Sequence, residues 1–352
     1  MNLPEIIISR ISQHGPISFH DYMEMCLYFP ELGYYTSKRP KIGSSGDFYT
    51  STNLTPVFGA LIGKQIVQMW IDLDRQPFDI VEVGAGNGQL CLDILTYLKS
   101  HDELYKQLQY FILEKSLSNV LLEKCRIRSS KVKWINQLND LPQLRGCILS
   151  NELIDNFSVH VLQMKESLME VFVDYQHGGF TEIPLPATKE QTDCLNDLGI
   201  KLPKGFRTEL NLSAHDYIKH TSESMQSGFL LTIDYGYLSH QLVTPSKREG
   251  TLVSYHQHKV SDRLYEDPGE RDITSHVNFS ALMHWGKQFG WKERLYANQG
   301  NFLLNLGFVK ELEQSFAEEK NIVLAAKRIA VLNHLLIYDM GTKFKVLIQE
   351  KQ

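Results

Sequence analysis

Short apolar runs alternate with helical stripes through the middle of the chain. A run of four to six mostly apolar residues indicates a buried strand, whereas apolar residues three or four positions apart indicate a helix that buries one face. By these criteria strands are expected at 79–83, 110–114, 132–135, 147–150 and 229–234, and helices at 89–99 and 118–125. Strands that alternate with helices predict right-handed crossovers and a mostly parallel sheet.

The flanking segments carry other patterns. Thr55-Pro56 is expected to open a helix, because Thr accepts a capping hydrogen bond and Pro at the first helical position lacks an N–H that would go unsatisfied. After Phe157 the pattern predicts a hairpin of 159–164 with 169–175, and then a Pro- and Gly-bearing stretch to about 206. Further helices are expected at 6–11, 19–27, 280–289, 302–306 and 309–317, and two late strands at 292–296 and 343–349.

These patterns predict an α/β protein with a Rossmann-like, mostly parallel sheet that ends in an antiparallel hairpin. We expect four segments: a helical N-terminal extension and lid at 1–75, a Rossmann-like core at 76–156, an inserted α+β cap region at 157–227, and the completion of the core at 228–352.

Composition and charge exclude several classes of protein. The 352 residues carry a formal net charge of -5, so no overall basic field would draw the chain to nucleic acid. The 5 cysteines are scattered without CxxC spacing, which favours a reducing compartment. No apolar run is long enough for membrane insertion, and the first residues match neither a signal peptide nor a good transit peptide. We therefore expect a cytoplasmic bacterial protein, with the mitochondrial matrix as the alternative.

A glycine-rich turn, VEVGAGNGQL, follows the first core strand. Gly84, Gly86 and Gly88 stand at every second position, with Ala85 between the first two. A dinucleotide fingerprint has its third glycine three residues after the second, and this chain has Gln89 there. The G-x-G-x-G spacing is the form typical of S-adenosylmethionine sites, because this cofactor needs bare main chain beside its methionine part and has no pyrophosphate.

Two acids accompany the turn. Glu82 precedes it within the strand, and Glu114 ends the next strand. A carboxylate at that strand end accepts both ribose hydroxyls, each charged hydrogen bond being worth about 1.5–3 kcal/mol. NAD-binding proteins use the same device, so Glu114 alone does not discriminate. The alternative is a purely structural turn with Glu114 as a solvated strand end.

The fourth core strand ends in LSNELIDNF. Ligands of open parallel sheets lie beyond the carboxyl ends of the strands, so Asn151, Glu152 and Asp155 are expected to face the cofactor crevice. Glu152 and Asp155 are three residues apart, a spacing that puts both on one face of a helical turn. Two carboxylates there would orient a cationic nucleophile. The alternative is that Asn151 and Asp155 cap a helix.

Several blocks, in order from about residue 15 to 350, resemble the MidA-type methyltransferases. The N-terminal segment of that family is similar to GYYTSKRPKIGSSGDFYTS, and the end of its fourth strand is similar to SNELIDNFSVH. Its Asp-Tyr-Gly motif corresponds to Asp234, Tyr235 and Gly236 in LLTIDYGY. Its C-terminal blocks are similar to GTLVSYHQHKV, DITSHVNF and NQGNFLLNLG.

The resemblance implies the class I Rossmann-like methyltransferase fold with S-adenosyl-L-methionine as cofactor. It also implies methylation of arginine in a protein, because the family includes a mitochondrial complex I assembly factor that methylates a complex I subunit. On this interpretation Glu152 binds guanidinium nitrogens and localises charge away from the reacting one, with Asp155 or Asp47 assisting. Positioning for in-line displacement supplies up to about 7–11 kcal/mol.

Further residues receive expected roles around the ligands. The Asp234–Gly236 motif would wall the substrate side, the alternative being a strand-ending turn. Thr50 and Ser51 would contact the methionine carboxylate, the alternative being a plain loop. His256 and His258 have no obvious third ligand nearby, so we expect a substrate contact for His258 and no metal.

One departure from the family leaves the acceptor open. Thr52 and Asn53 stand where many members have Pro-Glu, and that glutamate is a natural guanidinium contact. Apart from the identity of the acceptor, two other functions remain as alternatives. One is a non-catalytic assembly or scaffold protein that keeps the fold, and the other is an NAD-dependent oxidoreductase, which the glycine spacing disfavours.

Overall fold

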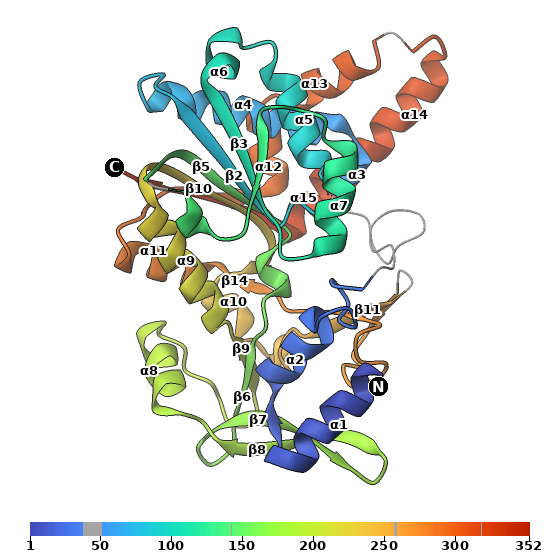
Figure 1. The fold of residues 1–352 in the computed structure, drawn as a ribbon, viewed down its shortest axis with the longest axis vertical. Coiled ribbons are helices and arrows are strands. Elements are labelled where there is room, and N and C mark those ends of the chain that lie inside the picture. Colours follow the sequence, from blue (N-terminus) through green and yellow to red (C-terminus); the bar gives the residue numbers. More distant parts are fainter. Residues whose placement is uncertain (38–50, 142, 257–258, 318) are drawn as a thin grey trace. The chain divides into compact units, whose positions relative to one another are not determined.

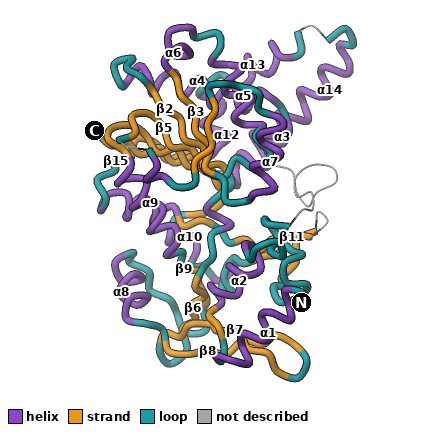
Figure 2. The backbone as a smooth tube through the Cα atoms, in the orientation of Figure 1, coloured by secondary structure: helices purple, strands orange, loops and turns teal. Residues whose placement is uncertain are grey.

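The computed structural model describes residues 1–37, 51–141, 143–256, 259–317 and 319–352. The chain forms two compact units. The core unit comprises the described residues of 49–153, 219–236 and 286–352, and the accessory unit comprises those of 1–48, 154–218 and 237–285. Figure 2 shows the strands of both units in orange.

The core unit contains a sheet in the order β15-β16-β10-β5-β2-β3-β4. Its strands are β2 Phe78–Val83, β3 Leu108–Leu113, β4 Val132–Ile135, β5 Leu144–Asn151, β10 Met225–Tyr237, β15 Lys292–Asn298 and β16 Phe344–Lys351. β2 pairs in parallel with β3 and β5, β3 with β4, and β5 with β10, whereas β16 runs antiparallel to β10 and β15. The predicted sheet, mostly parallel with an antiparallel final hairpin, is confirmed (Figure 1).

Three of these strands approach closely where they begin. Gly146 of β5 has a φ of 150°, and a Cβ there would lie 2.0 Å from the carbonyl oxygen of Asp79 in β2. Gly228 of β10 has a φ of 149°, and its Cβ would lie 2.1 Å from the carbonyl oxygen of Gly146. Glycine is therefore needed at both positions for this register.

Helices cover the core sheet, and their apolar residues pack in one cluster with those of β2, β3, β5, β10 and β16. The helix at Thr55-Pro56 is confirmed as α4, with the Thr55 hydroxyl accepting from Val57 N at 3.3 Å. The helices are α3 Ser51–Leu54, α4 Pro56–Asp72, α5 Gln89–Leu98, α6 Asp102–Gln107, α7 Leu117–Arg126, α12 Gln299–Asn305, α13 Phe308–Ser315, α14 Ile322–Asn333 and α15 Met340–Lys343, with the 3-10 turn η1 Leu138–Asp140 and the π-helix η4 His334–Asp339.

The accessory unit has its own sheet in the order β1-β7-β6-β9, with β8 paired to β7, and a small sheet β12-β11-β13. The predicted hairpin is confirmed as β6 and β7, which pair antiparallel. The strands are β1 Ile17–Ser18, β6 His160–Met164, β7 Leu168–Gln176, β8 Gly179–Pro186, β9 Arg207–Leu210, β11 Val253–His256, β12 Lys259–Ser261, β13 Asp272–Thr274 and β14 Val277–Asn278. The helices are α1 Leu3–His14, α2 Phe19–Tyr28, α8 Lys189–Asp197 and α10 Ser239–Leu242, with 3-10 turns η2 Ile154–Asn156 and η3 Pro245–Lys247.

The unit boundaries differ from the four segments expected from the sequence. α4 belongs to the core unit rather than to the N-terminal extension, because Phe58 and Ile62 bury their side chains in the core cluster. Residues 237–285 belong to the accessory unit, where Ile273 packs with Phe19 and Val161. Two helices, α9 Leu212–Ser224 and α11 Phe279–Gln288, continue from one unit into the other. Among the described residues, no helix combines the length and the apolar character needed to cross a bilayer.

Candidate functional site

The glycine turn joins β2 to α5 in a left-handed conformation. The φ angles are 72° at Gly84, 59° at Gly86 and 74° at Gly88, a region that residues with a side chain seldom adopt. Gly84 N donates to the carbonyl of Leu113 at 2.9 Å, and a Cβ at Gly88 would lie 2.7 Å from Ile127 Cδ1. The turn therefore requires glycine at these positions. As a result, three residues of the turn carry no side chain that could cover the main chain.

Glu114 lies directly after β3 and beside this turn. Its Oε1 accepts from Ser116 N at 2.8 Å, and the main-chain N–H of Gly86 also donates to the carboxylate. Burial raises the pKa of Glu114, and these main-chain donors act against that rise. The acid and the glycine turn are thus brought together, and contact with a ribose stays a prediction.

Glu82 points into the packed interior rather than toward solvent. It is 3% exposed, and its Oε2 accepts from the Tyr110 hydroxyl at 2.6 Å. Burial, aided by the neighbouring Glu114 and opposed by the hydrogen bond from Tyr110, raises the pKa of Glu82 to about 7. Ala85 is likewise buried. Cofactor contacts by Glu82 and Ala85 stay predictions.

α7 supports the turn through residues that sequence reasoning missed. Arg126 Nη1 donates to the carbonyl of Asn87 at 3.1 Å, which ties the end of α7 to the turn. Glu123 is fully buried, and its Oε2 accepts from Trp134 Nε1 at 2.7 Å. Burial raises the pKa of Glu123 to about 8. The two residues are three positions apart and share a face of α7, but the helix predicted from the sequence ended at 125, one residue before Arg126.

Asn151, Glu152 and Ser51 meet at the carboxyl end of β5. Glu152 N donates to the carbonyl of Ile233 at 2.9 Å, which fixes the chain as it leaves the sheet. Glu152 Oε1 accepts from Asn151 Nδ2 at 3.2 Å and from Ser51 N at 3.4 Å. Ser51 opens α3 and is fully buried, so it is not the plain loop residue of the alternative. Three residues predicted for the site are therefore neighbours.

The expectation that Glu152 shares a helical turn with Asp155 is wrong. Glu152 has a left-handed φ of 52°, and the 3-10 turn η2 begins only at Ile154. Asp155 lies in the accessory unit, is 3% exposed, and accepts from Asn156 Nδ2 at 3.0 Å through Oδ1. Its carbonyl accepts from Ser275 N at 3.0 Å. These hydrogen bonds hold Asp155 within the accessory unit. A catalytic role for Asp155 stays a prediction.

Asp234 and its neighbours lie inside β10 and not in a strand-ending turn, because β10 continues to Tyr237. Asp234 is fully buried, its Oδ2 accepts from Leu153 N at 3.2 Å, and its Oδ1 accepts from Tyr235 N at 2.8 Å. The Tyr235 ring packs edge-to-face on Phe344 with centroids 5.5 Å apart. Asp234 therefore anchors the chain just after Glu152, while substrate contacts by Asp234, Tyr235 and Gly236 stay predictions.

Two buried amide oxygens at this end of the sheet have no hydrogen-bond donor in the described chain. They are Asn151 Oδ1 and Gln299 Oε1. Gln299 is fully buried at the start of α12, and its Nε2 donates to Ser51 Oγ at 3.4 Å. A buried acceptor without a donor costs about 1–3 kcal/mol, which a ligand rich in N–H or O–H groups would offset. Sequence reasoning missed Gln299, although it lies in the NQGNFLLNLG block.

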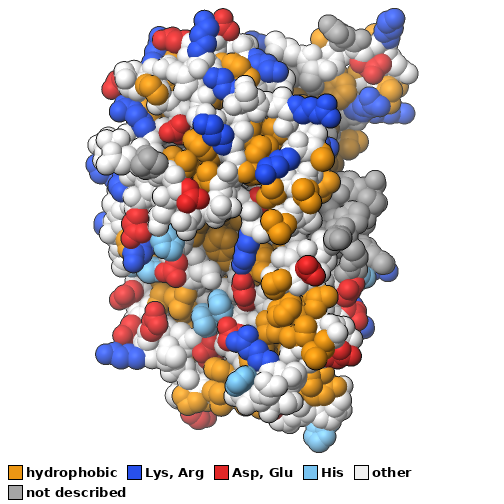
Figure 3. All heavy atoms as spheres, in the orientation of Figure 1, with side chains coloured by type: hydrophobic (Ala, Val, Ile, Leu, Met, Phe, Trp, Pro, Cys, Tyr) orange, Lys and Arg blue, Asp and Glu red, His pale blue; other side chains and the backbone are white. Residues whose placement is uncertain are grey.

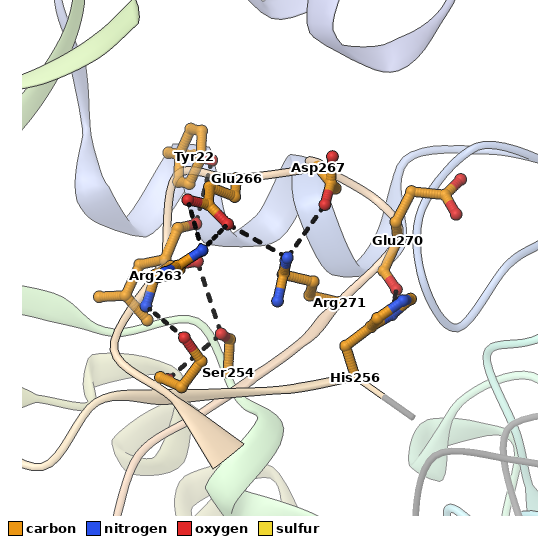
Figure 4. A network of polar contacts seen from close by, with 10 residues as sticks. Tyr22, Ser254, His256, Arg263, Glu266, Asp267, Glu270 and Arg271 are labelled. Carbon is orange, nitrogen blue, oxygen red and sulfur yellow. Dashed lines mark hydrogen bonds and ion pairs between the residues drawn. The ribbon is translucent and has the colours of Figure 1, made fainter. Parts of the chain in front are cut away.

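Three predicted residues, Asp47, Thr50 and His258, lie outside the described residues. His256 ends strand β11 of the accessory unit, and its Nδ1 is 3.2 Å from the carbonyl oxygen of Glu270 (Figure 4). The described residues contain no group of three or more His, Cys, Asp or Glu able to hold a metal ion.

The arrangement suits a nucleoside that carries a cationic amino-acid part. The glycine turn offers main chain that carries no side chains at its three glycines, and Glu114 offers a carboxylate beside it. The two donor-less amide oxygens lie near Ser51 and Glu152. S-adenosyl-L-methionine has hydroxyls, an ammonium and a sulfonium, which match acceptors of this kind.

Comparison with known proteins agrees with this chemistry. A mitochondrial protein arginine methyltransferase NDUFAF7 homolog from Caenorhabditis elegans is 26% identical over 98% of this chain and 85% of its own length. The Drosophila melanogaster homolog of the same name is 27% identical over 98% of this chain and 84% of its length. A Burkholderia thailandensis crystal structure with bound S-adenosyl-homocysteine has a TM-score of 0.87 at 27% identity, and covers 99% of this chain and 92% of that one. Residues 61–297 match the S-adenosyl-L-methionine-dependent methyltransferase family of MidA type, and the chain belongs to that family.

Proposed function

We propose that this methyltransferase acts on the guanidinium group of an arginine in a substrate protein. We further propose that this substrate is a subunit of respiratory complex I, methylated during assembly of the complex. The relatives from worm and fly support arginine as the acceptor, since both are named protein arginine methyltransferases. The complex I subunit follows from the family resemblance. Both relatives are also named mitochondrial, and for this chain we retain the bacterial cytoplasm with the matrix as the alternative.

The observation that carries this proposal is the set of acceptors beside Ser51. The Glu152 carboxylate accepts from Ser51 N, and Gln299 Oε1, whose amide group donates to Ser51 Oγ, has no hydrogen-bond donor among the described residues. A guanidinium has five N–H donors in a planar fork, which is the group best able to satisfy several oxygens at once. A lysine ammonium has only three donors and no planar fork, so it fits this set less well.

The bound cofactor supplies a sulfonium methyl group, whose carbon–sulfur bond breaks as a carbon–nitrogen bond forms. Glu152 is proposed to bind two guanidinium nitrogens, so that positive charge concentrates there and the third nitrogen keeps electron density. The methylated nitrogen, which Glu152 does not bind, releases its extra proton to water. Glu114 and the glycine turn are proposed to bind the nucleoside, with Asn151 and Ser51 near its methionine part.

The test uses purified protein, cofactor with a labelled methyl group, and extract from cells that lack the protein. We expect label in a complex I subunit, with methylarginine at the labelled site by mass spectrometry. Glu152→Gln should lower kcat by roughly 10²–10³, as removal of an electrostatic stabiliser does. Its affinity for S-adenosyl-homocysteine should stay within about twofold of the wild type.

Glu103→Gln serves as the matched control, because the Glu103 side chain is 66% exposed on α6 and should leave kcat unchanged. Label on lysine or on a small molecule would overturn the choice of acceptor. Cofactor binding without any transfer would favour the non-catalytic assembly protein instead.

A further inference from the structure

α14 is an apolar helix of the core unit that is exposed along most of its length. Exposure reaches 80% at Ile322, 65% at Val323 and 57% at Val331, and Ala325 is its one buried residue. In Figure 1 the helix extends away from the core sheet, and Figure 3 shows hydrophobic, basic and a few acidic side chains at that place. Exposed apolar residues grouped in this way usually mark a contact surface.

Only one face of α14 is needed for folding. Ala325 is buried, and Ile329 and Leu332 pack against the core cluster. Val323, Lys327 and Val331 recur every four residues on the other side, and all three are exposed. A helix with apolar residues on both faces is expected to be covered on both.

The charge carried by α14 itself has one sign. The sequence has no Asp or Glu between Glu319 and Asp339, although the whole chain carries a net charge of -5. The cations in that stretch are Lys320, Lys327 and Arg328. Arg328 Nη1 lies 3.8 Å from Glu319 Oε2, whereas Lys327 forms no ion pair within the described part of the chain. The charged residues of α14 itself are thus both basic, Lys327 and Arg328.

We propose that α14 binds the surface of an anionic lipid membrane and lies in the plane of the interface. Val323 and Val331 would enter the boundary between headgroups and acyl chains, and Lys327 would contact lipid phosphates. This inference goes beyond the proposed function and does not depend on it. A second copy of the chain is a poorer occupant. Lys327 lies at the middle of the helix, so a two-fold contact on this face would bring two lysines together.

The test is co-sedimentation of the whole protein with vesicles of phosphatidylcholine mixed with phosphatidylglycerol, and with vesicles of pure phosphatidylcholine. We expect binding to the anionic vesicles that weakens as salt rises. Lys327→Gln should weaken it about fivefold, and Val323→Asn combined with Val331→Asn about tenfold or more.

Val260→Asn is the matched control, because Val260 is 60% exposed on β12 of the accessory unit and should not affect binding. Folding of each variant is checked by circular dichroism, and substitutions at such exposed sites should leave it intact. Absence of binding to anionic vesicles, or equal binding by the double variant, would overturn the proposal. Self-association without vesicles that the double variant abolishes would also overturn it, and would identify a protein interface instead.

Discussion

Replacing Glu123 by glutamine should stabilise the core unit at neutral and alkaline pH. The Glu123 carboxyl is fully buried, and burial raises its pKa from 4.5 to about 8. The folded protein therefore keeps the proton through neutral pH, while the unfolded chain has lost it. Because the folded state binds more protons in this window, the contribution of Glu123 to stability is complete below pH 4.5 and is lost as the pH rises to about 8.

The two pKa values set the size of the effect. At about 1.36 kcal/mol per pH unit, ionisation of Glu123 lowers the free energy of unfolding of the wild type relative to its value below pH 4.5. As upper bounds, the loss is about 3 kcal/mol at pH 7 and about 5 kcal/mol above pH 8. Glutamine keeps an oxygen acceptor for Trp134 Nε1, now 2.7 Å from Glu123 Oε2, so the variant removes the ionisation and keeps the hydrogen bond. For a unit of this size each kcal/mol corresponds to about 2–4 °C in Tm.

The assay is urea unfolding of both proteins across the range from about pH 5 to pH 9, followed by tryptophan fluorescence. The difference in unfolding free energy between variant and wild type should grow steadily with pH. Glu103→Gln, at a side chain that is 66% exposed, should show no such trend. A difference that stays constant across the pH range would refute the idea that Glu123 is protonated in the folded protein.

Three further predictions concern the ligand site and the two units. Glu114→Gln should weaken S-adenosyl-homocysteine binding in calorimetry by about tenfold or more, since a charged hydrogen bond contributes about 1.5–3 kcal/mol. Gly146→Ala should abolish the cooperative thermal transition, because its Cβ would lie 2.0 Å from the Asp79 carbonyl oxygen. Gly178→Ala, with no atom within 4 Å, should cost about 1 kcal/mol. Burial lowers the pKa of His276 to about 4, so the unfolded chain binds a proton below pH 6.5 that the folded accessory unit does not. The free energy of unfolding of this unit should therefore fall by up to about 3 kcal/mol between pH 6.5 and pH 4 in urea unfolding, and His276→Asn should remove that loss.

The sequence predicts those elements of the fold in which apolar residues follow a regular pattern over a short stretch of the chain. β2, β3, β4, β5 and β10 are short apolar runs, and α5 and α7 carry a one-sided stripe, so each is visible in a window of about a dozen residues. α14 was not predicted because apolar residues follow one another from Ile322 onward, and no stripe stands out. The units also escaped prediction, since the packing of Ile273 with Phe19 joins residues far apart in the chain.

The residues of the candidate site also fall into those that local spacing predicts and those that depend on contacts between distant parts of the chain. The glycine turn and Glu114 follow from spacing along the chain, and the structure brings them together. The left-handed backbone of Glu152 depends on its hydrogen bond to Ile233 in another strand, so a helical spacing rule misplaced it. Gln299 joins Ser51 across 248 positions of sequence, a contact that no local pattern contains.

The interleaved course of the chain affects how it folds during synthesis. β2 to β5 leave the ribosome early, but β10, which pairs with β5, follows only after the intervening residues 154–218 of the accessory unit. β16 lies between β10 and β15, so this side of the sheet closes only when residue 351 has emerged. Until β10 emerges, β5 presents a bare edge of apolar residues, and β10 then presents such an edge until β16 emerges. A bare edge of this kind is a template for aggregation. Nascent chains of this protein should therefore depend on chaperones that shield such an edge.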